Sequence, residues 1–190
     1  PDRDAVADAV EILAAATSPV LIVGDRVAQS GAATEALRLA ELLGARVYST
    51  VYSEINYPTG HPQYLGAVSP RLPSGREVLS SADAVVAVGT DVFPSLFYTS
   101  GHALRPETKL VHIDSASREI GKAEPTDVGI VADPKVALAE LADALERSMS
   151  GSARETAKGR AASVAEEKAV KKATWDQLVK RRWDHTPMSS

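Results

Sequence analysis

Short apolar runs alternate with segments of helical periodicity along the first 148 residues of the chain. The run PVLIVG, which begins at Pro19, is unbroken and rich in β-branched residues, as is typical of a strand buried on both faces. Residues 36–43 instead carry apolar side chains at helical spacing, and Gly44 follows them where a left-handed cap is expected. This pattern predicts strands at 19–24, 46–50, 82–89, 109–114 and 128–133, and helices at 4–16, 36–43, 74–81 and 134–145.

The alternation of strands and helices predicts a fold class. Parallel neighbours need crossover connections, and these are almost always right-handed, so alternating elements indicate a parallel sheet. We therefore predict an α/β fold, a doubly wound parallel sheet of five or six strands with helices on both faces, for a central domain at residues 1–148. Residues 56–70, NYPTGHPQYLGAVSP, are rich in proline and glycine and are predicted to form a long loop without regular structure.

The character of the chain changes after residue 148. Residues 149–190 are rich in alanine and charge, and their large apolar side chains are concentrated near Trp175 and Trp183. We predict a helical linker here, directed towards a further domain. Because two tryptophans on a sparse helix are costly to leave in water, we expect them to dock on this domain or on another one.

Charge and composition narrow the function classes. The chain has 190 residues, a net charge of -4 with both signs scattered, and no cysteine, so neither a nucleic-acid-binding face nor a disulfide or thiolate site is indicated. The first residues lack the basic region of a signal peptide, and no apolar run approaches a membrane span. We expect a cytoplasmic protein with no nucleic-acid or membrane partner. Because the chain begins with proline, we expect it to be a mature form or an excised piece of something longer.

Common catalytic and cofactor motifs are missing. The residues after Gly24, DRVAQSG, lack the glycine spacing of a dinucleotide loop, and the sequence contains no GxxxxGK[ST] phosphate loop. Its four histidines lie far apart, with no HExxH spacing for a metal. His112 falls inside a predicted strand and is interpreted as structural. We predict no metal site and no catalytic residue.

Three residues are candidates for ligand contact because each ends a predicted strand. They are Gly24, Gly89 and Asp114. The carboxyl ends of strands line the crevice in which open α/β sheets bind ligands, and an acid at Asp114 could bind a ribose hydroxyl. The alternatives are that both glycines serve tight turns, and that Asp114 caps the following turn. Asp133, before Pro134, is predicted to be a helix cap.

The run from Lys109 to Asp133, KLVHIDSASREIGKAEPTDVGIVAD, resembles a stretch of the thiamine diphosphate dependent enzymes. In that family a strand leads through EIGKN into a second strand that ends in an acid. The segments AVEILAAATSPVLIVGDRV, NYPTGHPQYLG and ADAVVAVGTDV resemble further parts of the family's central domain, in the family's order. The resemblance spans roughly Val10 to Leu145 and implies a Rossmann-like central domain, which in the family lies between a pyrimidine-binding and a diphosphate-binding domain.

The resemblance also implies what this chain does not do alone. In the family, the glutamate that activates thiamine belongs to the pyrimidine-binding domain, and the magnesium motif that begins with GDG belongs to the diphosphate-binding domain. This sequence has no GDG. The resemblance therefore implies a chain that is inactive by itself and binds no cofactor. Its partners would be the two other domains of a homo-oligomeric enzyme, a dimer or tetramer, that uses thiamine diphosphate and magnesium.

Two segments bear on the branch of the family. Where acetolactate synthases carry an FAD-binding turn and an RFDDRVTG-like segment, this chain has GDRVAQSG and TDVFPSLFYTSG. It is closest in character to benzoylformate decarboxylase, although Leu96 stands where that enzyme has a catalytic histidine. The implied function is a structural, subunit-packing domain of a 2-oxo acid decarboxylase or related lyase. The alternative is a regulatory domain that binds ADP or FAD, as in relatives of oxalyl-CoA decarboxylase or acetolactate synthase.

Overall fold

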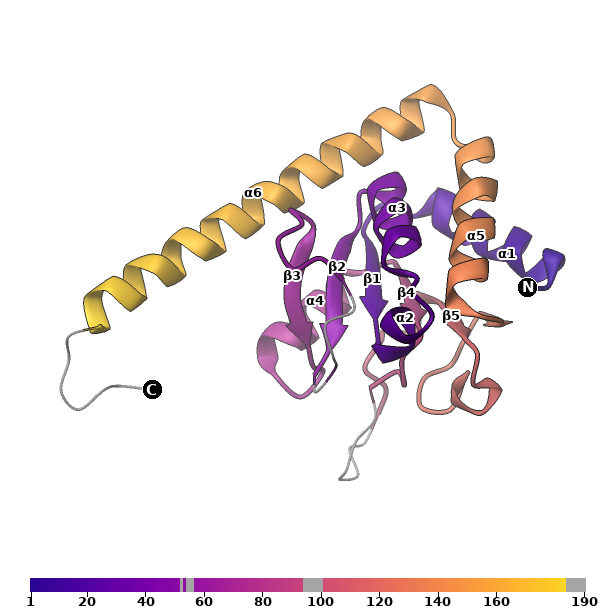
Figure 1. Ribbon diagram of the computed structural model, residues 1–190, viewed down its shortest axis with the longest axis horizontal. Helices are drawn as coiled ribbons and strands as arrows, with labels where there is room; N and C mark the ends of the chain where they lie inside the picture. Colours follow the sequence, from indigo (N-terminus) through magenta and orange to yellow (C-terminus); the bar gives the residue numbers. More distant parts are fainter. Residues whose placement is uncertain (52, 54–56, 94–100, 184–190) are drawn as a thin grey trace.

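A computed structural model describes residues 1–51, 53, 57–93 and 101–183 (Figure 1). Its strands are β1 (Pro19–Val23), β2 (Arg46–Thr50), β3 (Tyr64–Val68), β4 (Ala84–Val88), β5 (Lys109–Asp114) and β6 (Val128–Val131). Its helices are α1 (Arg3–Ala15), α2 (Asp25–Gln29), α3 (Ala33–Leu43), α4 (Pro73–Ser81), α5 (Pro134–Ser148) and α6 (Gly151–Arg182), with a short 3-10 helix η1 (Ser117–Glu119). Helices lie between β1 and β2 and between β3 and β4, and α5 follows β6, in the order that the sequence pattern predicts.

All six strands form one parallel sheet in the order β3-β2-β1-β4-β5-β6. The chain builds outward from β1 to β2 and β3, then returns to place β4 on the other side of β1. The direction of winding therefore reverses between β1 and β4, and in open α/β sheets this switch point is where ligands bind. The predicted doubly wound α/β class is confirmed.

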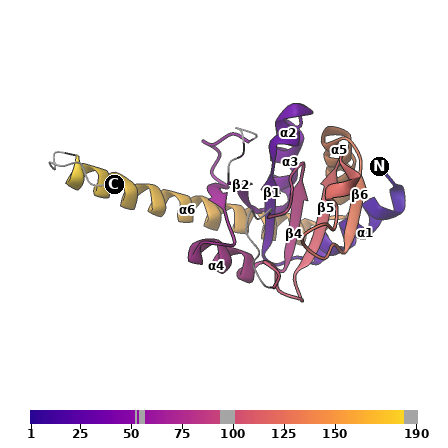
Figure 2. The ribbon, with the colours of Figure 1, turned by 90° about the horizontal axis from the view of Figure 1, so that it is seen from below.

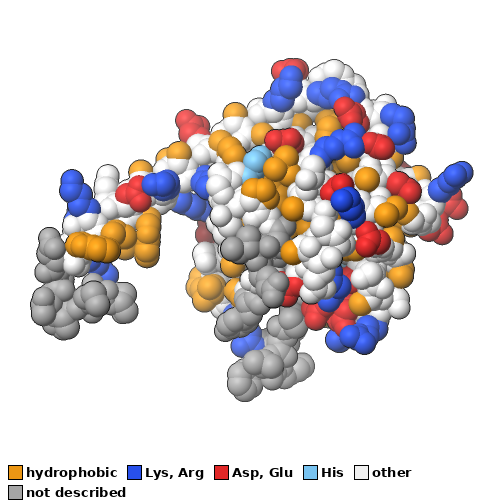
Figure 3. Space-filling model, viewed as in Figure 1, with side chains coloured by type: hydrophobic (Ala, Val, Ile, Leu, Met, Phe, Trp, Pro, Cys, Tyr) orange, Lys and Arg blue, Asp and Glu red, His pale blue; other side chains and the backbone are white. Residues whose placement is uncertain are grey.

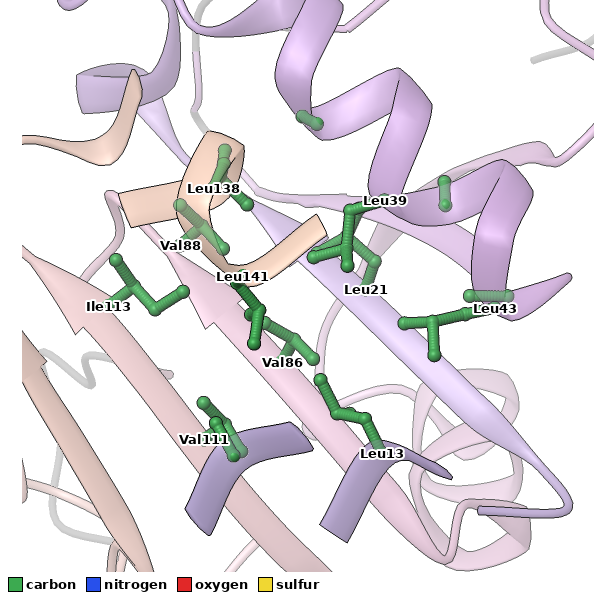
Figure 4. Close-up of a cluster of buried hydrophobic side chains, with 14 of the residues drawn as sticks. Leu13, Leu21, Leu39, Leu43, Val86, Val88, Val111, Ile113, Leu138 and Leu141 are labelled. Atoms are coloured by element: carbon green, nitrogen blue, oxygen red, sulfur yellow. The ribbon is translucent and has the colours of Figure 1, made fainter. Parts of the chain in front are cut away.

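The larger apolar layer lies between the sheet and the helices α1, α3 and α5. Successive strand residues point to opposite faces, so Leu21 and Val23 of β1 enter this layer while Val20 and Ile22 enter the other. Figure 4 shows leucines of α1, α3 and α5 meeting strand side chains here. Burial on both faces explains the unbroken apolar runs of the strands.

The second face of the sheet carries α4, which Figure 2 shows on the side of the sheet opposite to α3 and α5. Leu79 of α4 is fully buried against Val85 of β4, Leu110 of β5 and Tyr48 of β2. Helices thus cover both faces, but unequally, because α1, α2, α3 and α5 contribute buried side chains on one face and α4 on the other.

Helix α6 leaves this body at an angle and runs past β3 (Figure 1). Its inner half packs on α3, where Arg160 donates from Nε (3.1 Å) and Nη2 (2.7 Å) to the carbonyl of Leu43. A Cβ atom at Gly44, which has a φ of +61°, would lie 2.1 Å from the carbonyl oxygen of Ala157. A glycine is therefore needed both to end α3 and to admit α6.

The prediction that residues 56–70 form a loop without regular structure was wrong, because they contain β3. Among the described strands it pairs with β2 alone, with a register shift between Val47 and Ser49, and Gly66 within it has a φ of +107°. Of its five residues, Val68 alone is buried. An irregular strand at the sheet edge buries little apolar surface, so its hydrophobic signal is weak.

Candidate functional site at the switch point of the sheet

Gly24 and Gly89 lie side by side at the switch point, directly after β1 and β4. The backbone N–H of Arg26 donates to the carbonyl of Gly89 at 3.1 Å. A Cβ atom on Gly24 would lie 2.3 Å from Cβ of Thr90, and one on Gly89 would lie 2.8 Å from the backbone nitrogen of Val27. Gly89 also has a φ of +59°. Both positions need glycine for close approach of the two turns, as the turn interpretation expects.

Arg26 joins this backbone cluster to Asp114 at the end of β5. Its Nε and Nη2 donate to Oδ2 of Asp114 at 2.9 and 2.7 Å, and Nη2 also donates to Oδ1 of Asp91 at 2.7 Å. The second oxygen of Asp114 accepts the N–H of Ala116 at 2.7 Å, as expected of a residue that caps the following turn. The structure therefore brings the three predicted residues together and adds Arg26 and Asp91.

The charges in this cluster are compensated within the chain. The Asp114 side chain is 0% exposed, whereas the side chains of Arg26 and Asp91 are 25% and 44% exposed. Burial alone would lower the pKa of Arg26, but hydrogen bonds and charges from Asp114 and Asp91 outweigh burial, so the pKa lies above its ordinary value. Arg26 therefore covers the one acid of the crevice that the sequence singled out.

His112 lies two residues before Asp114 on β5 and is 1% exposed. Its Nε2 lies 3.0 Å from the carbonyl oxygen of Thr90, and its Nδ1 is buried with no hydrogen-bond partner in the part of the chain that the structure describes. Burial lowers the pKa of His112, and the Thr90 carbonyl and Asp114 only partly oppose this. A neutral ring that donates from Nε2 to Thr90 fits a structural histidine.

The arrangement also bears on cofactors. A nucleotide ribose could reach Asp114 only after Arg26 moved away, because the carboxylate is fully buried beneath the guanidinium. For metals, the described residues contain no group of three or more His, Cys, Asp or Glu side chains placed to hold an ion. That no cofactor binds to this chain stays a prediction. Leu96 lies outside the described residues.

A cavity of about 540 Å³ lies at the opposite end of the strands, next to the residues that lead into β5 and β6. Glu124 lines it and is 6% exposed, with Oε1 accepting the N–H of Ala103 at 2.8 Å and Oε2 lying 3.4 Å from Nδ1 of His102. This end of the sheet holds the amino ends of the strands, away from the switch point.

The described helices include none that is long and apolar enough to cross a membrane.

Arg26 and Asp91 were not predicted as site residues, although the sequence contains a signal for them. Each stands two residues after a strand-ending glycine, in GDR and GTD, and these two turns flank the switch point. A basic and an acidic residue at matching positions on neighbouring strands are placed to pair. The strand order, which the sequence pattern does not fix, is what makes these two turns neighbours.

The family can now be stated. Residues 6–141 match the family model described as the thiamine pyrophosphate enzyme, central domain. The match covers most of the chain and agrees with the parallel sheet of six strands. The chain belongs to this family, as its resemblance implied.

Known relatives carry out several reactions. An acetolactate synthase of Mycobacterium bovis is 37% identical over 143 residues, which cover 74% of this chain and 23% of that protein. Among solved structures, the thiamine diphosphate-dependent 4-hydroxybenzoylformate decarboxylase of Rhodococcus jostii RHA1 has a TM-score of 0.68 at 29% identity, covering 76% of this chain and 28% of that one. The benzoylformate decarboxylase of Polynucleobacter necessarius has a TM-score of 0.69 at 27% identity, covering 75% and 27%. The chain thus spans about a quarter of the length of these proteins.

Proposed function

We propose that this chain is the structural and subunit-packing central domain of a thiamine diphosphate dependent 2-oxo acid decarboxylase or related lyase, and that it is inactive alone. The observation that carries this proposal is the Arg26 ion pair with buried Asp114, which fills the strand-end crevice from within the chain. The central domain would comprise residues 1–148, and residues 149–190 would link it to a diphosphate-binding domain. Thiamine diphosphate and magnesium would be held by the other domains of a cytoplasmic homo-oligomer, which we call the parent enzyme.

The choice of a decarboxylase rests on the neighbours in structure and on the sequence of two turns. Two solved neighbours are decarboxylases by name, and GDRVAQSG and TDVFPSLFYTSG lack the features expected for FAD. The acetolactate synthase relative favours the synthase branch. An assay of the parent enzyme with benzoylformate and with pyruvate separates the two branches by the product that each substrate yields.

Calorimetric titration of the purified chain tests the structural role. We expect no binding of ADP, FAD or NAD at micromolar concentrations, because Arg26 occupies the crevice. Thiamine diphosphate with magnesium should leave the melting temperature unchanged, since a ligand that binds only the folded state raises it. Micromolar binding of any of the three nucleotides, or a rise in melting temperature, would contradict the proposal.

The alternative is a nucleotide-binding regulatory domain that uses Gly24, Gly89 and Asp114. Its support is their position at the switch point, where open sheets bind ligands. Binding would require Arg26 to exchange Asp114 for a phosphate or to swing out with Asp91. An Arg26→Ala variant, which uncovers Asp114, should then bind ADP more weakly if Arg26 holds the phosphate, and more tightly if Arg26 only blocks the ribose site. If ADP binds neither the unmodified chain nor the Arg26→Ala variant, the alternative is rejected.

A further inference from the structure

The outer half of α6, residues 169–183, carries exposed apolar side chains that the described residues do not cover. Trp175 is 64% exposed and Trp183 is 76% exposed, and they are the two tryptophans of the sequence. The inner half of the same helix, by contrast, buries Ala157 and Val164 to 2% exposure. One helix therefore has a half that packs on its own domain and a half that does not.

Four apolar side chains of this half, of which Val179 is half-buried, share one side of the helix, whereas Val170, 63% exposed, lies on another side. Trp175, Leu178, Val179 and Trp183 follow the i, i+3, i+4, i+8 spacing of a single stripe, which we call the tryptophan face. Figure 3 shows hydrophobic side chains gathered towards the outer end of this helix. A stripe of this kind is typical of a helix that docks on a partner surface, whereas scattered apolar residues are not.

The tryptophan face continues into a groove between α6 and the edge strand β3. The groove has a volume of about 300 Å³, and Trp175, Tyr64 and Leu65 are among the residues that line it. Lys168 also lines it, and its Nζ donates to the carbonyls of Thr59 and His61 at 2.7 Å each. The face and the groove together offer a concave apolar surface at the edge of the sheet.

The charge around this surface indicates the chemistry of its partner. Residues 171–182 contain five basic residues and one acid, a net charge of +4, although the whole chain has a net charge of -4. A second copy of the same face would bring like charges together, and an acidic rim would complement it. The basic residues are Lys171, Lys172, Lys180, Arg181 and Arg182, and the acid is Asp176.

We infer that the tryptophan face and its groove form the docking surface for another domain of the parent enzyme, one that presents an apolar patch with an acidic rim. This inference rests on the proposed function, because it takes the chain to be one domain of a longer enzyme. The relatives supply the occupant, since the chain spans 23% of the acetolactate synthase that it matches. The continuous helix α6 would then set the position of that domain relative to the sheet.

Limited trypsin digestion compares the 190-residue chain with the full-length parent enzyme. Trypsin cleaves after the five basic residues at 171–182 only when that part of the helix opens, and docking suppresses opening. We expect cleavage in this segment to be at least tenfold slower in the parent enzyme. The double substitution Trp175→Asp with Leu178→Asp should restore fast cleavage there, whereas Val136→Asp, at an equally exposed apolar residue of α5, should not.

Two outcomes overturn the inference. Equal cleavage rates in the chain and in the parent enzyme would show that the tryptophan face stays uncovered. A dimer of the 190-residue chain in sedimentation velocity, lost in the double variant, would show that a second copy is the occupant. Stimulation of the parent enzyme by thiamine diphosphate is measured separately, so failure of the proposed function is distinguished from failure of docking.

Discussion

The strand-end crevice and the outer half of α6 are both places where this chain could meet something outside itself. In the crevice, Arg26 pairs with Asp114 and Asp91, and the two glycine turns bind each other through backbone hydrogen bonds. On α6, both tryptophans of the tryptophan face are more than half exposed in the described part of the chain, and its charged rim is strongly basic. The polar site is thus satisfied within the chain, while the apolar site is not.

This difference between the crevice and the tryptophan face indicates which of the two is suited to bind a partner. A buried carboxylate that already has an arginine and a backbone N–H gains little from a ligand, because the ligand must first displace them. Exposed tryptophans gain whenever a surface covers them, since burial removes large apolar areas from water. The strand-end crevice, where this fold class binds ligands, is therefore less available to a partner than the tryptophan face.

The strongest perturbation of the crevice is Gly24→Ala. The added Cβ would lie 2.3 Å from Cβ of Thr90 and 2.4 Å from the carbonyl oxygen of Gly89, so the two turns must separate. We expect a loss of about 3 kcal/mol in the free energy of unfolding, measured with urea. Gly60→Ala is the control, because no atom lies within 4 Å of its added Cβ, and it should change stability little. Equal effects would contradict the close packing of the turns.

Asp114→Asn tests the ion pair with little change of shape. It removes the buried one of the two charged partners of Arg26 and leaves Asp91, so we expect a loss of about 2 kcal/mol. The matched control is Asp143→Asn, which removes an exposed Arg–Asp pair with Arg38 and should cost at most about 0.5 kcal/mol. If the two substitutions cost the same in chemical denaturation, the crevice is not held by this pair.

His112 gives the crevice a pH dependence. Burial lowers its pKa in the folded state, so below pH 6.5, the ordinary value, the unfolded chain binds a proton that the folded chain does not. Its contribution to stability is present above that pH and is lost as the pH falls further. His112→Gln should therefore reduce the decline in stability between pH 7 and pH 5. An unchanged decline in urea midpoints would show that the ring takes up its proton at the same pH in the folded and the unfolded chain.

The smallest effect is expected on α6 in the isolated chain. Trp175→Ala removes a side chain that the domain does not cover, so stability should stay within about 0.5 kcal/mol. Leu39→Ala, in the core of the same chain, should cost about 2–5 kcal/mol. A loss of more than about 1 kcal/mol at Trp175 would mean that the tryptophan face packs within the chain.

Most of the sheet could be predicted from the sequence because its central strands are buried on both faces. Residues 19–24 and 82–89 form unbroken apolar runs, and the structure places β1 and β4 there. The strand at 64–68 could not be found in this way, because it lies at the edge and needs pairing with one neighbour only. Asp133 was predicted as a cap and is one, since its Oδ1 accepts the N–H of Lys135 at 2.9 Å.

Three residues of the candidate site could be predicted from the sequence, and two could not. Gly24, Gly89 and Asp114 follow from strand ends, which the apolar runs mark directly. Arg26 and Asp91 lie 65 positions apart in sequence, and only the parallel order of β1 beside β4 brings them together. That order depends on tertiary packing, so local pattern cannot supply it. The role of these residues in nucleotide binding stays a prediction.

Native-state hydrogen exchange of the isolated chain compares both regions in one experiment. The amides of Gly24, Arg26 and Gly89 are hydrogen-bonded at the switch point and should exchange only through global unfolding. The amides of residues 170–182 should exchange at least about 100-fold faster, because none of these residues is buried against the described part of the chain. Equal protection of the two regions would contradict the account, as would switch-point amides that exchange quickly until ADP or FAD is added.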